Sequence, residues 1–257
     1  MARRARLEDR GAWVFDRMVD AYAARPDYPA SLVDAVALRL AGRARIADIG
    51  AGMGHLALPL ARRGLPITAI EPALGMRDAL ETRATGLWRH APESKGSPIT
   101  VLHAMAEALP FEERSLDAAL ICDAIHFLDV ARTGAELRRT LARGAALIVI
   151  TCEMADTPFM RAVRTAMEEA APRRPRQVDH AIARLFRATN AVAEAPETFD
   201  DATPVDLGAL VRILESISFI GPAMNAERSA RFRERVLSIS DAPVWSRRFV
   251  LHAARVR

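Results

Sequence analysis

The residues with the clearest potential for chemistry in this sequence form a glycine-rich turn after a short apolar run. Residues 45–49 are mostly apolar and contain Asp48, and glycines follow at alternate positions, at Gly50, Gly52 and Gly54. Glycine adopts positive φ readily and lets a ligand approach the backbone closely, and a helix that begins at such a turn offers free N–H groups. We therefore expect a buried strand that turns into a helix around a small ligand.

The spacing of these glycines separates two classes of ligand. The dinucleotide fingerprint G-x-G-x-x-G would place its third glycine at position 55, which is His55. The observed order is D-x-G-x-G-x-G instead. This spacing disfavours an NAD-dependent oxidoreductase.

Two further features follow the next two apolar runs. Glu71 ends residues 66–71, and its carboxylate can accept hydrogen bonds from both hydroxyls of a ribose. Residues 103–111 come directly after the third run and are followed by the triplet SLD at residues 115–117. Because ligands bind outside the carboxyl ends of the strands in an open α/β sheet, we expect these features and the glycine turn to meet at one site.

The elements that must position these residues alternate between strand and helix along the chain. Most of the five apolar runs are nearly continuous rather than alternating, which is typical of strands covered on both faces by helices. The fold class predicted is α/β, with a doubly wound, Rossmann-like, mostly parallel sheet. Two capping helices are predicted before the first strand, over residues 12–24 and 31–42, the second with Ser31 as its N-cap. The five strands are expected at residues 45–49, 66–71, 99–103, 116–122 and 145–151.

After Cys152 the pattern changes to helices alone. Apolar residues recur at helical spacing in three stretches with loop-like sequence between them, including residues 195–203, and a weak alternating pattern at residues 247–257 predicts a final strand at a sheet edge. Three parts are therefore expected: an α/β core with capping helices at residues 1–154, a helical lid insertion that sets substrate specificity at residues 155–240, and a strand that returns to the core sheet at residues 241–257.

The composition narrows the partners and the compartment. The 257 residues suffice for one large α/β domain with a lid, no apolar run approaches the ~18 residues of a membrane span, and the basic start lacks the apolar region of a secretory signal. The net charge of +4 comes from arginines spread along the chain, and the basic cluster at residues 173–176 has no interleaved aromatics, so a nucleic-acid partner is not expected. Cys122 and Cys152 are expected to be reduced, buried thiols, and no metal site is indicated. We expect a cytoplasmic monomer or homodimer.

The motifs resemble those of a known family. The order D-x-G-x-G-x-G resembles motif I of the class I S-adenosylmethionine (SAM) dependent methyltransferases. Residues 106–111, AEALPF, are similar to a segment common in the family's small-molecule enzymes, whose loop packs on adenine. Residues 22–29, with Tyr22, Arg25 and the pair of prolines, resemble the N-terminal segment of the trans-aconitate methyltransferase-like subgroup. The resemblance implies SAM as cofactor, S-adenosylhomocysteine (SAH) as product, and a small-molecule acceptor.

The resemblance also implies a set of cofactor-binding residues. Glu71 would hold the ribose, and Arg25 would suit the methionine carboxylate, because a guanidinium binds a carboxylate in two-pronged fashion. The family often has an acid before the Ala-Glu pair, where this chain has Met105, so adenine would be met through Ala106 and Glu107. The full set is Tyr22, Arg25, Asp48, Gly50, Ala51, Gly52, Gly54, Glu71, Met76, Met105, Ala106, Glu107 and Cys122.

The residues after the fourth strand are the expected catalytic groups. His126 is a candidate base that deprotonates the acceptor, since its ordinary pKa of about 6.5 suits that task, and Asp123 is a second candidate. Packing at a helix start is the alternative role for His126. An acceptor carboxylate is expected to meet an arginine of the lid, with Arg161, Arg164 and Arg212 as candidates. An RNA methyltransferase and a non-catalytic SAM-binding protein remain alternatives.

Overall fold

The computed structural model describes residues 15–16, 18–90, 99–171, 177–221, 225–239 and 242–257. Its centre is a sheet of eight strands in the order β3-β2-β1-β4-β5-β8-β6, with β7 also paired to β8. The chain start and the basic cluster at residues 173–176 lie outside the described residues. No described helix has both the length and the apolar character needed to span a bilayer.

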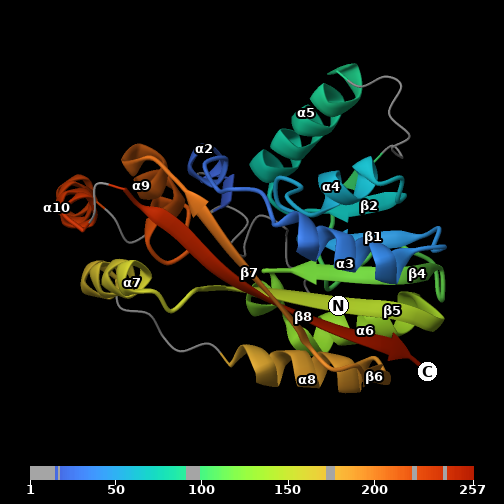
Figure 1. Cartoon of the computed structure of the whole chain (residues 1–257). Helices are drawn as coiled ribbons and strands as arrows, with labels where there is room; N and C mark the ends of the chain where they lie inside the picture. Colours follow the sequence, from blue (N-terminus) through green and yellow to red (C-terminus); the bar gives the residue numbers. More distant parts are fainter. Residues whose placement is uncertain (1–14, 17, 91–98, 172–176, 222–224, 240–241) are drawn as a thin grey trace, which may run out of the picture.

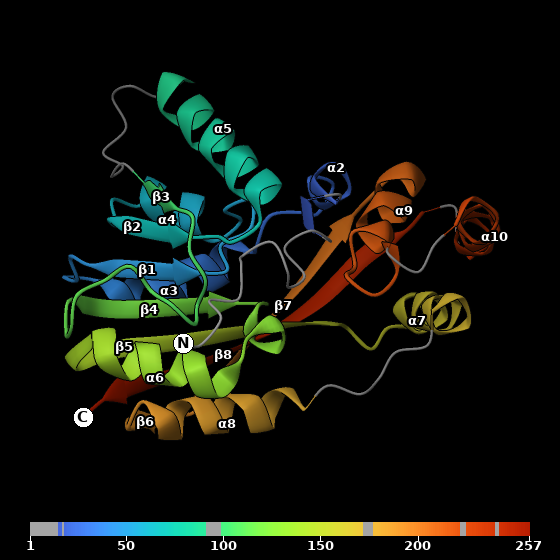
Figure 2. The same ribbon diagram turned by 180° about the vertical axis from the view of Figure 1, so that it is seen from behind.

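Five strands confirm the predicted parallel half of the sheet. β1 pairs with β2 and β4, β2 with β3, and β4 with β5, all parallel. Because the strands run the same way, their carboxyl ends lie together at one edge, on the side of α7 and α9 (Figure 2). The strands are Ile46–Ile49 (β1), Ile67–Ile70 (β2), Thr100–Leu102 (β3), Leu116–Cys122 (β4) and Leu141–Met154 (β5).

Helices cover both faces of this sheet, which confirms the doubly wound arrangement (Figure 1). Apolar side chains of α3 (Ala30–Leu40), α4 (Ala57–Arg62) and α5 (Leu74–His90) pack on one face. Those of α6 (Val130–Thr140) and α8 (Val178–Ala188) pack on the other. Residues that alternate along β1 therefore enter two different cores, with Ile46 in the first and Ala47 in the second.

Local sequence explains two helix starts. The expected N-cap at Ser31 is wrong: α3 begins at Ala30, and Pro29 precedes it in an extended conformation, with φ −61° and ψ 141°. α4 begins at Ala57, so Pro59 lies in the first turn, where a missing N–H breaks no helical hydrogen bond. In the N-terminal region the described residues contain the short helix α2, Val19–Tyr22.

The C-terminal half of the chain corrects two expectations. Residues 191–204 were expected to contain no strand, but they form β6 (Ala191–Ala193) and β7 (Glu197–Pro204), both antiparallel to β8. β8, Val244–Val256, was expected at an edge but lies between β5 on one side and β6 and β7 on the other. The sequence of β7 does not show the apolar alternation typical of a strand, because three of its four half-buried residues are polar: Glu197, Asp201 and Thr203, with Phe199 the exception.

Three helices pack together beyond the carboxyl ends of the parallel strands. α7 (Pro158–Ala170), α9 (Leu207–Glu215) and α10 (Ala226–Leu237) share an apolar cluster that includes Met160, Leu214 and Trp245. α8 lies apart from them against α6 (Figure 1). We call α7, α9 and α10 the lid helices. α8 covers the sheet instead.

Candidate functional site

The three glycines of the turn after β1 all have positive φ, for different reasons. φ is 71° at Gly50, 54° at Gly52 and 80° at Gly54. A Cβ at Gly50 would lie 2.8 Å from the Ala124 Cβ, and one at Gly54 would lie 2.3 Å from the Leu80 Cδ1, so these two glycines permit close packing. At Gly52 the nearest heavy atom, Tyr22 Cε1, is 4.0 Å away. Gly52 is thus the glycine that leaves space for a ligand.

Glu71 joins the glycine turn to the turn after β2. Its Oε2 accepts a hydrogen bond from the Gly52 N–H at 2.7 Å, and its Oε1 accepts one from the Ala73 N–H at 2.8 Å. Burial raises the pKa of Glu71, and Asp16 adds to this effect, while the two N–H groups oppose it. Each carboxylate oxygen keeps a second lone pair that can accept a hydrogen bond from a ribose hydroxyl.

Asp48 lies beneath the same turn and is almost fully buried, with 1% of its surface exposed. Its Oδ1 has no hydrogen-bond partner among the described residues. Burial, together with the nearby Glu71 carboxylate, raises the pKa of Asp48 to about 7. A buried polar atom without a partner is costly, so Oδ1 is a place where a ligand donor would be stabilised.

Met105, Ala106 and Glu107, which were expected around adenine, and the predicted cofactor residue Met76 differ in their contacts. Met105 forms an isolated bridge with Ala108, and Ala106 is buried. Glu107 accepts a hydrogen bond from the Asp129 N–H at 2.8 Å, so its carboxylate fixes the loop to the start of α6. Met76 is buried in a small apolar cluster with Met18 and Met53.

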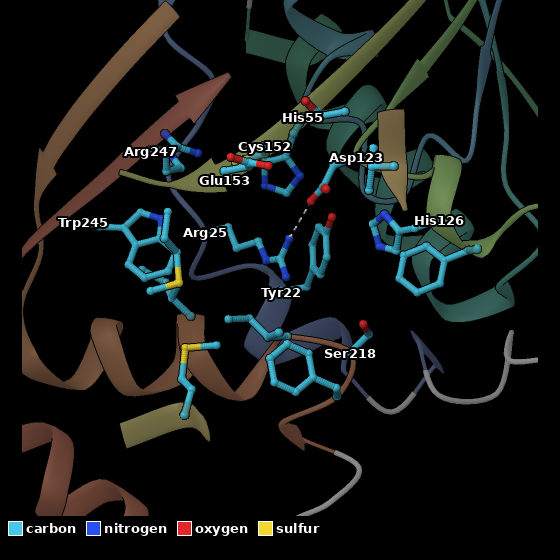
Figure 3. Close-up of a pocket in the computed structure, with 18 of the residues that line it drawn as sticks. Tyr22, Arg25, His55, Asp123, His126, Cys152, Glu153, Ser218, Trp245 and Arg247 are labelled. Atoms are coloured by element: carbon cyan, nitrogen blue, oxygen red, sulfur yellow. Dashed lines mark ion pairs between the residues drawn. The ribbon is translucent and has the colours of Figure 1, made fainter. Parts of the chain in front are cut away.

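A cavity of about 370 Å³ adjoins this turn beyond the carboxyl ends of β4 and β5. It lies between the N-terminal strap, which we define as residues 22–28, and the lid helices (Figure 3). Four of the predicted cofactor-binding and catalytic residues line it, namely Tyr22, Arg25, Asp123 and His126, whereas the glycines of the turn, Glu71 and Met105 do not. The residues that line it include Tyr22, Arg25, Tyr28, His55, Asp123, His126, Phe127, Cys152, Arg164, Phe219, Trp245 and Arg247.

Tyr22 and Arg25 lie at the junction between the glycine turn and the cavity. The Arg25 guanidinium stacks over the Tyr22 ring at 4.1 Å from its centroid and lies 3.8 Å from the Asp123 carboxylate. Its Nε and Nη2 donate to the side-chain and backbone oxygens of Ser216, at 2.7 and 3.0 Å. Arg25 therefore joins the strap to the end of α9, in the middle of the cavity wall (Figure 3).

Asp123 and His126 follow β4 directly. Asp123 adopts the left-handed conformation with φ 49°, and its N–H donates to the Ile150 carbonyl at 2.8 Å. A non-glycine residue in this region marks a backbone held by its surroundings. His126 lies in the 3-10 turn Ile125–Phe127, with its ring centroid 4.0 Å from that of Phe127. Both predicted catalytic residues thus face the cavity.

Other site residues were not identified from the sequence. His55, noted above for its place in the glycine spacing, has its ring centroid 5.5 Å from that of Tyr22 and 6.1 Å from that of Tyr28. Burial, assisted by Arg83, Arg25 and Arg247, lowers the pKa of His55 to about 3, so the ring is neutral at physiological pH. Its position directly after the third glycine is a signal that could have placed it at the ligand. Trp245 and Arg247 gave no such signal, because they lie on β8, far along the chain from the motifs of the turn.

The expected thiols and lid arginines are also placed. Cys122 and Cys152 are unpaired thiols, and burial raises the pKa of each, but only Cys152 lines the cavity. Of the three arginines expected to meet an acceptor carboxylate, Arg164 lines the cavity. Arg161 pairs with Asp156 at the surface instead, and Arg212 is not among the lining residues. No metal-ligand cluster is found within the described ranges.

Part of the sequence is similar to that of known methyltransferases. Residues 47–149 match the family described as "Methyltransferase domain". An uncharacterized methyltransferase of Mycobacterium tuberculosis (strain ATCC 25618 / H37Rv) is 36% identical over 135 residues, which are 52% of this chain and 49% of that protein. A ubiquinone biosynthesis O-methyltransferase of Methylocella silvestris is 40% identical over 88 residues, 34% of this chain and 31% of its own. The chain spans about half the length, or less, of these curated relatives.

Solved structures share the fold. The YcgJ protein from Bacillus subtilis superposes with a TM-score of 0.57 at 18% identity, covering 88% of this chain and 97% of that one. Geranyl diphosphate C-methyltransferase from Streptomyces coelicolor A3(2), solved with Mg²⁺, geranyl-S-thiolodiphosphate and SAH, gives 0.51 at 16% identity, covering 88% and 76%. At these identities the likeness concerns the architecture alone.

Asp48 should make folding stability depend on pH in a specific direction. Below about pH 4 the carboxyl group is protonated in both states, whereas between about pH 4 and 7 it ionises in the unfolded chain and keeps its proton in the folded one. The free energy of unfolding should therefore fall across this range, by up to about 1.4 kcal/mol per pH unit, and level off above it. Denaturant unfolding of the wild type and of Asp48→Asn at several pH values measures this. The two stability curves should diverge between pH 4 and 7, and parallel curves would contradict the assignment.

Proposed function

We propose that this chain transfers the methyl group of SAM to a small-molecule acceptor, since its residues 47–149 match the family described as "Methyltransferase domain". The acceptor binds in the cavity between the strap and the lid helices. The observation that carries this proposal is the junction at Tyr22, where the space above Gly52 meets the cavity wall.

The residues of the turn fit the cofactor. Gly52 provides space that a side chain would fill, and Glu71 has free lone pairs for the ribose hydroxyls. Asp48 has a buried oxygen with no hydrogen-bond partner in the described part of the chain. Met105 and Ala106 are proposed to meet the adenine, with Glu107 holding their loop in place through Asp129. Arg25 and Tyr22 are proposed to meet the methionine end.

SAM, when bound, supplies a methyl group on a cationic sulfur, so the reactive chemistry belongs to the cofactor. The chain's own residues then have three tasks: to hold the acceptor, to exclude water and to take up the acceptor's proton. The strap and the lid helices form opposite walls of the cavity and exclude water. His126 is proposed to take the proton at a ring nitrogen, and Asp123 to orient Arg25.

The walls favour an acceptor with an apolar or aromatic body. Four aromatic side chains line the cavity: Tyr22, Phe127, Phe219 and Trp245. Tyr22 lies near Asp123, and Trp245 lies on the other side of Arg25 (Figure 3). Aromatic side chains bury large apolar areas while their polar edges still form hydrogen bonds. Arg164 places a cation at the lid side, where an acidic substituent of the acceptor would be stabilised.

Gly52→Asp should abolish SAH binding without unfolding the protein. The new carboxylate would occupy the ligand space beside the Glu71 carboxylate. Among the described residues, chain neighbours aside, the nearest heavy atom to the added Cβ is Tyr22 Cε1, at 4.0 Å. Asp tolerates the left-handed conformation better than most residues. Gly42→Asp is the matched control, because Gly42 also has positive φ, with open space around it, and lies in the turn after α3. Calorimetric titration with SAH measures the affinity of each variant.

Two results of that titration would refute the cofactor assignment. One is a wild type that binds a nicotinamide dinucleotide but neither SAM nor SAH. The other is a Gly52→Asp variant with unchanged affinity for SAH. Loss of affinity in the Gly42→Asp control as well would mean that the substitution acts through the fold.

His126→Ala should lower turnover by about 100-fold or more while leaving the affinity for SAH unchanged, if the histidine is the base. The measurement is SAH release with each member of a library of small hydroxylated and amino compounds, and with total RNA. Full turnover of the variant would exclude the base. Turnover with RNA alone would favour an RNA methyltransferase, and SAH binding with no turnover would favour a non-catalytic SAM-binding protein.

A further inference from the structure

Arg247 is buried against the strap and is not among the site residues predicted from the sequence. Arg247, on β8, pairs with Asp201 on the neighbouring strand β7, and only 5% of the arginine side chain and 17% of the aspartate side chain are exposed. The Arg247 Nε donates to Asp201 Oδ2 at 2.9 Å, and its Nη2 also bonds this oxygen. Breaking such a pair leaves an uncompensated charge, while replacing both partners is often tolerated.

The same guanidinium holds the backbone of the strap. Its Nη1 donates to the Pro26 carbonyl at 3.0 Å, and its Nη2 donates to the Asp27 carbonyl at 2.6 Å. Pro26 and Pro29 have no N–H to donate, so this part of the chain has fewer backbone hydrogen bonds of its own to define it. The planar fork of Arg247 thus fixes two consecutive carbonyls that lie 221 and 220 residues away in the sequence.

The carbonyls that Arg247 holds lie between Arg25 and Tyr28, two of the strap residues that line the cavity. Arg25 directly precedes Pro26, and its guanidinium lies over Tyr22 and toward Asp123. Tyr28 directly follows Asp27, and its ring packs against Phe249 at 5.2 Å between centroids. A change in the 26–27 backbone would therefore move Arg25 relative to the glycine turn.

We infer that Arg247 is a positioning residue: through the carbonyls of Pro26 and Asp27 it sets the strap so that Arg25 and Tyr22 lie at the junction of cofactor site and cavity. The inference rests on the proposed function, in which Arg25 meets the methionine end of SAM. Arg247 also lines the cavity near Trp245 (Figure 3), so the strand that carries the acceptor wall holds the strap as well.

The chain offers a matched control in the next residue. Arg248 pairs with Asp200 on the same two strands, with Nε 2.7 Å from Oδ1, but 53% and 62% of these side chains are exposed. The strand register places Asp200 opposite Arg248 and Asp201 opposite Arg247. The two pairs have the same chemistry on opposite faces of one ladder, and only the buried pair contacts the strap.

Arg247→Lys and Arg248→Lys form the first comparison. Lysine keeps the charge beside the aspartate but lacks the planar fork that bonds Asp201 and two carbonyls together. We expect amide hydrogen exchange in residues 22–28 of the ligand-free protein to become at least about tenfold faster in Arg247→Lys, since local opening sets exchange rates. The calorimetric affinity for SAH should fall at least about tenfold. Arg248→Lys should match the wild type in both measurements.

A double substitution separates positioning from stability. Arg247→Met with Asp201→Asn removes both charges together, so no buried charge is left unpaired, and a folded protein with nearly unchanged Tm is expected. Its SAH affinity should still fall as in Arg247→Lys, because the carbonyls of the strap have lost their donor. The inference would be overturned if SAH affinity fell only in variants whose Tm also falls and stayed at the wild-type value wherever Tm is kept.

A mutant cycle with Arg25 tests the route of the effect. If Arg247 acts through Arg25, Arg247→Lys should weaken SAH binding in the wild type and have no further effect in Arg25→Met. Additive losses, or Arg25→Met with wild-type affinity, would overturn the inference. If the wild type does not bind SAH, the proposed function fails, and the ligand-free exchange comparison still decides whether Arg247 holds the strap.

Discussion

The arrangement of the site depends on two hydrogen bonds that the Glu71 carboxylate accepts. It accepts hydrogen bonds from Gly52 and Ala73, so it ties the turn after β1 to the turn after β2 at the carboxyl edge of the sheet. Burial penalises the charge of this group and raises its pKa, and the two N–H groups offset part of that penalty. The turn is thereby held open above Gly52 with an acid at its side, which is the environment that suits a ribose.

The walls of the cavity come from segments that lie far apart in the chain, so the site also depends on how these segments are held together. The parallel strands bring the glycine turn, Glu71 and Asp123 to one edge, but the far walls come from the strap and the lid helices. Two arginines connect these parts: Arg25 bonds Ser216 at the end of α9, and Arg247 bonds the strap and Asp201. The cavity therefore has walls from segments far apart in the chain, while the family match covers residues 47–149.

Sequence analysis predicted the half of the fold in which local patterns and tertiary demands agree. Buried parallel strands are continuous apolar runs, so β1 to β5 were placed within a few residues, and the glycine spacing located the turn. β7 was missed because the half-buried residues that alternate along it are mostly polar. β8 was expected at an edge because its pairing with β6 and β7 depends on strands that the sequence pattern did not reveal. His55 carries a local signal, because it directly follows the third glycine of the turn. Arg247 acts through contacts with residues more than 200 positions away in the sequence, which no local pattern encodes.

The central claim is that one ligand spans the glycine turn and reaches the cavity. A crystal structure of the protein with SAH tests it most directly. We expect the ribose at Glu71, the adenine against Met105 and Ala106, and the sulfur facing the cavity beside Tyr22 and Asp123. Electron density for SAH at another surface, or within the cavity with the space above Gly52 unfilled, would contradict it.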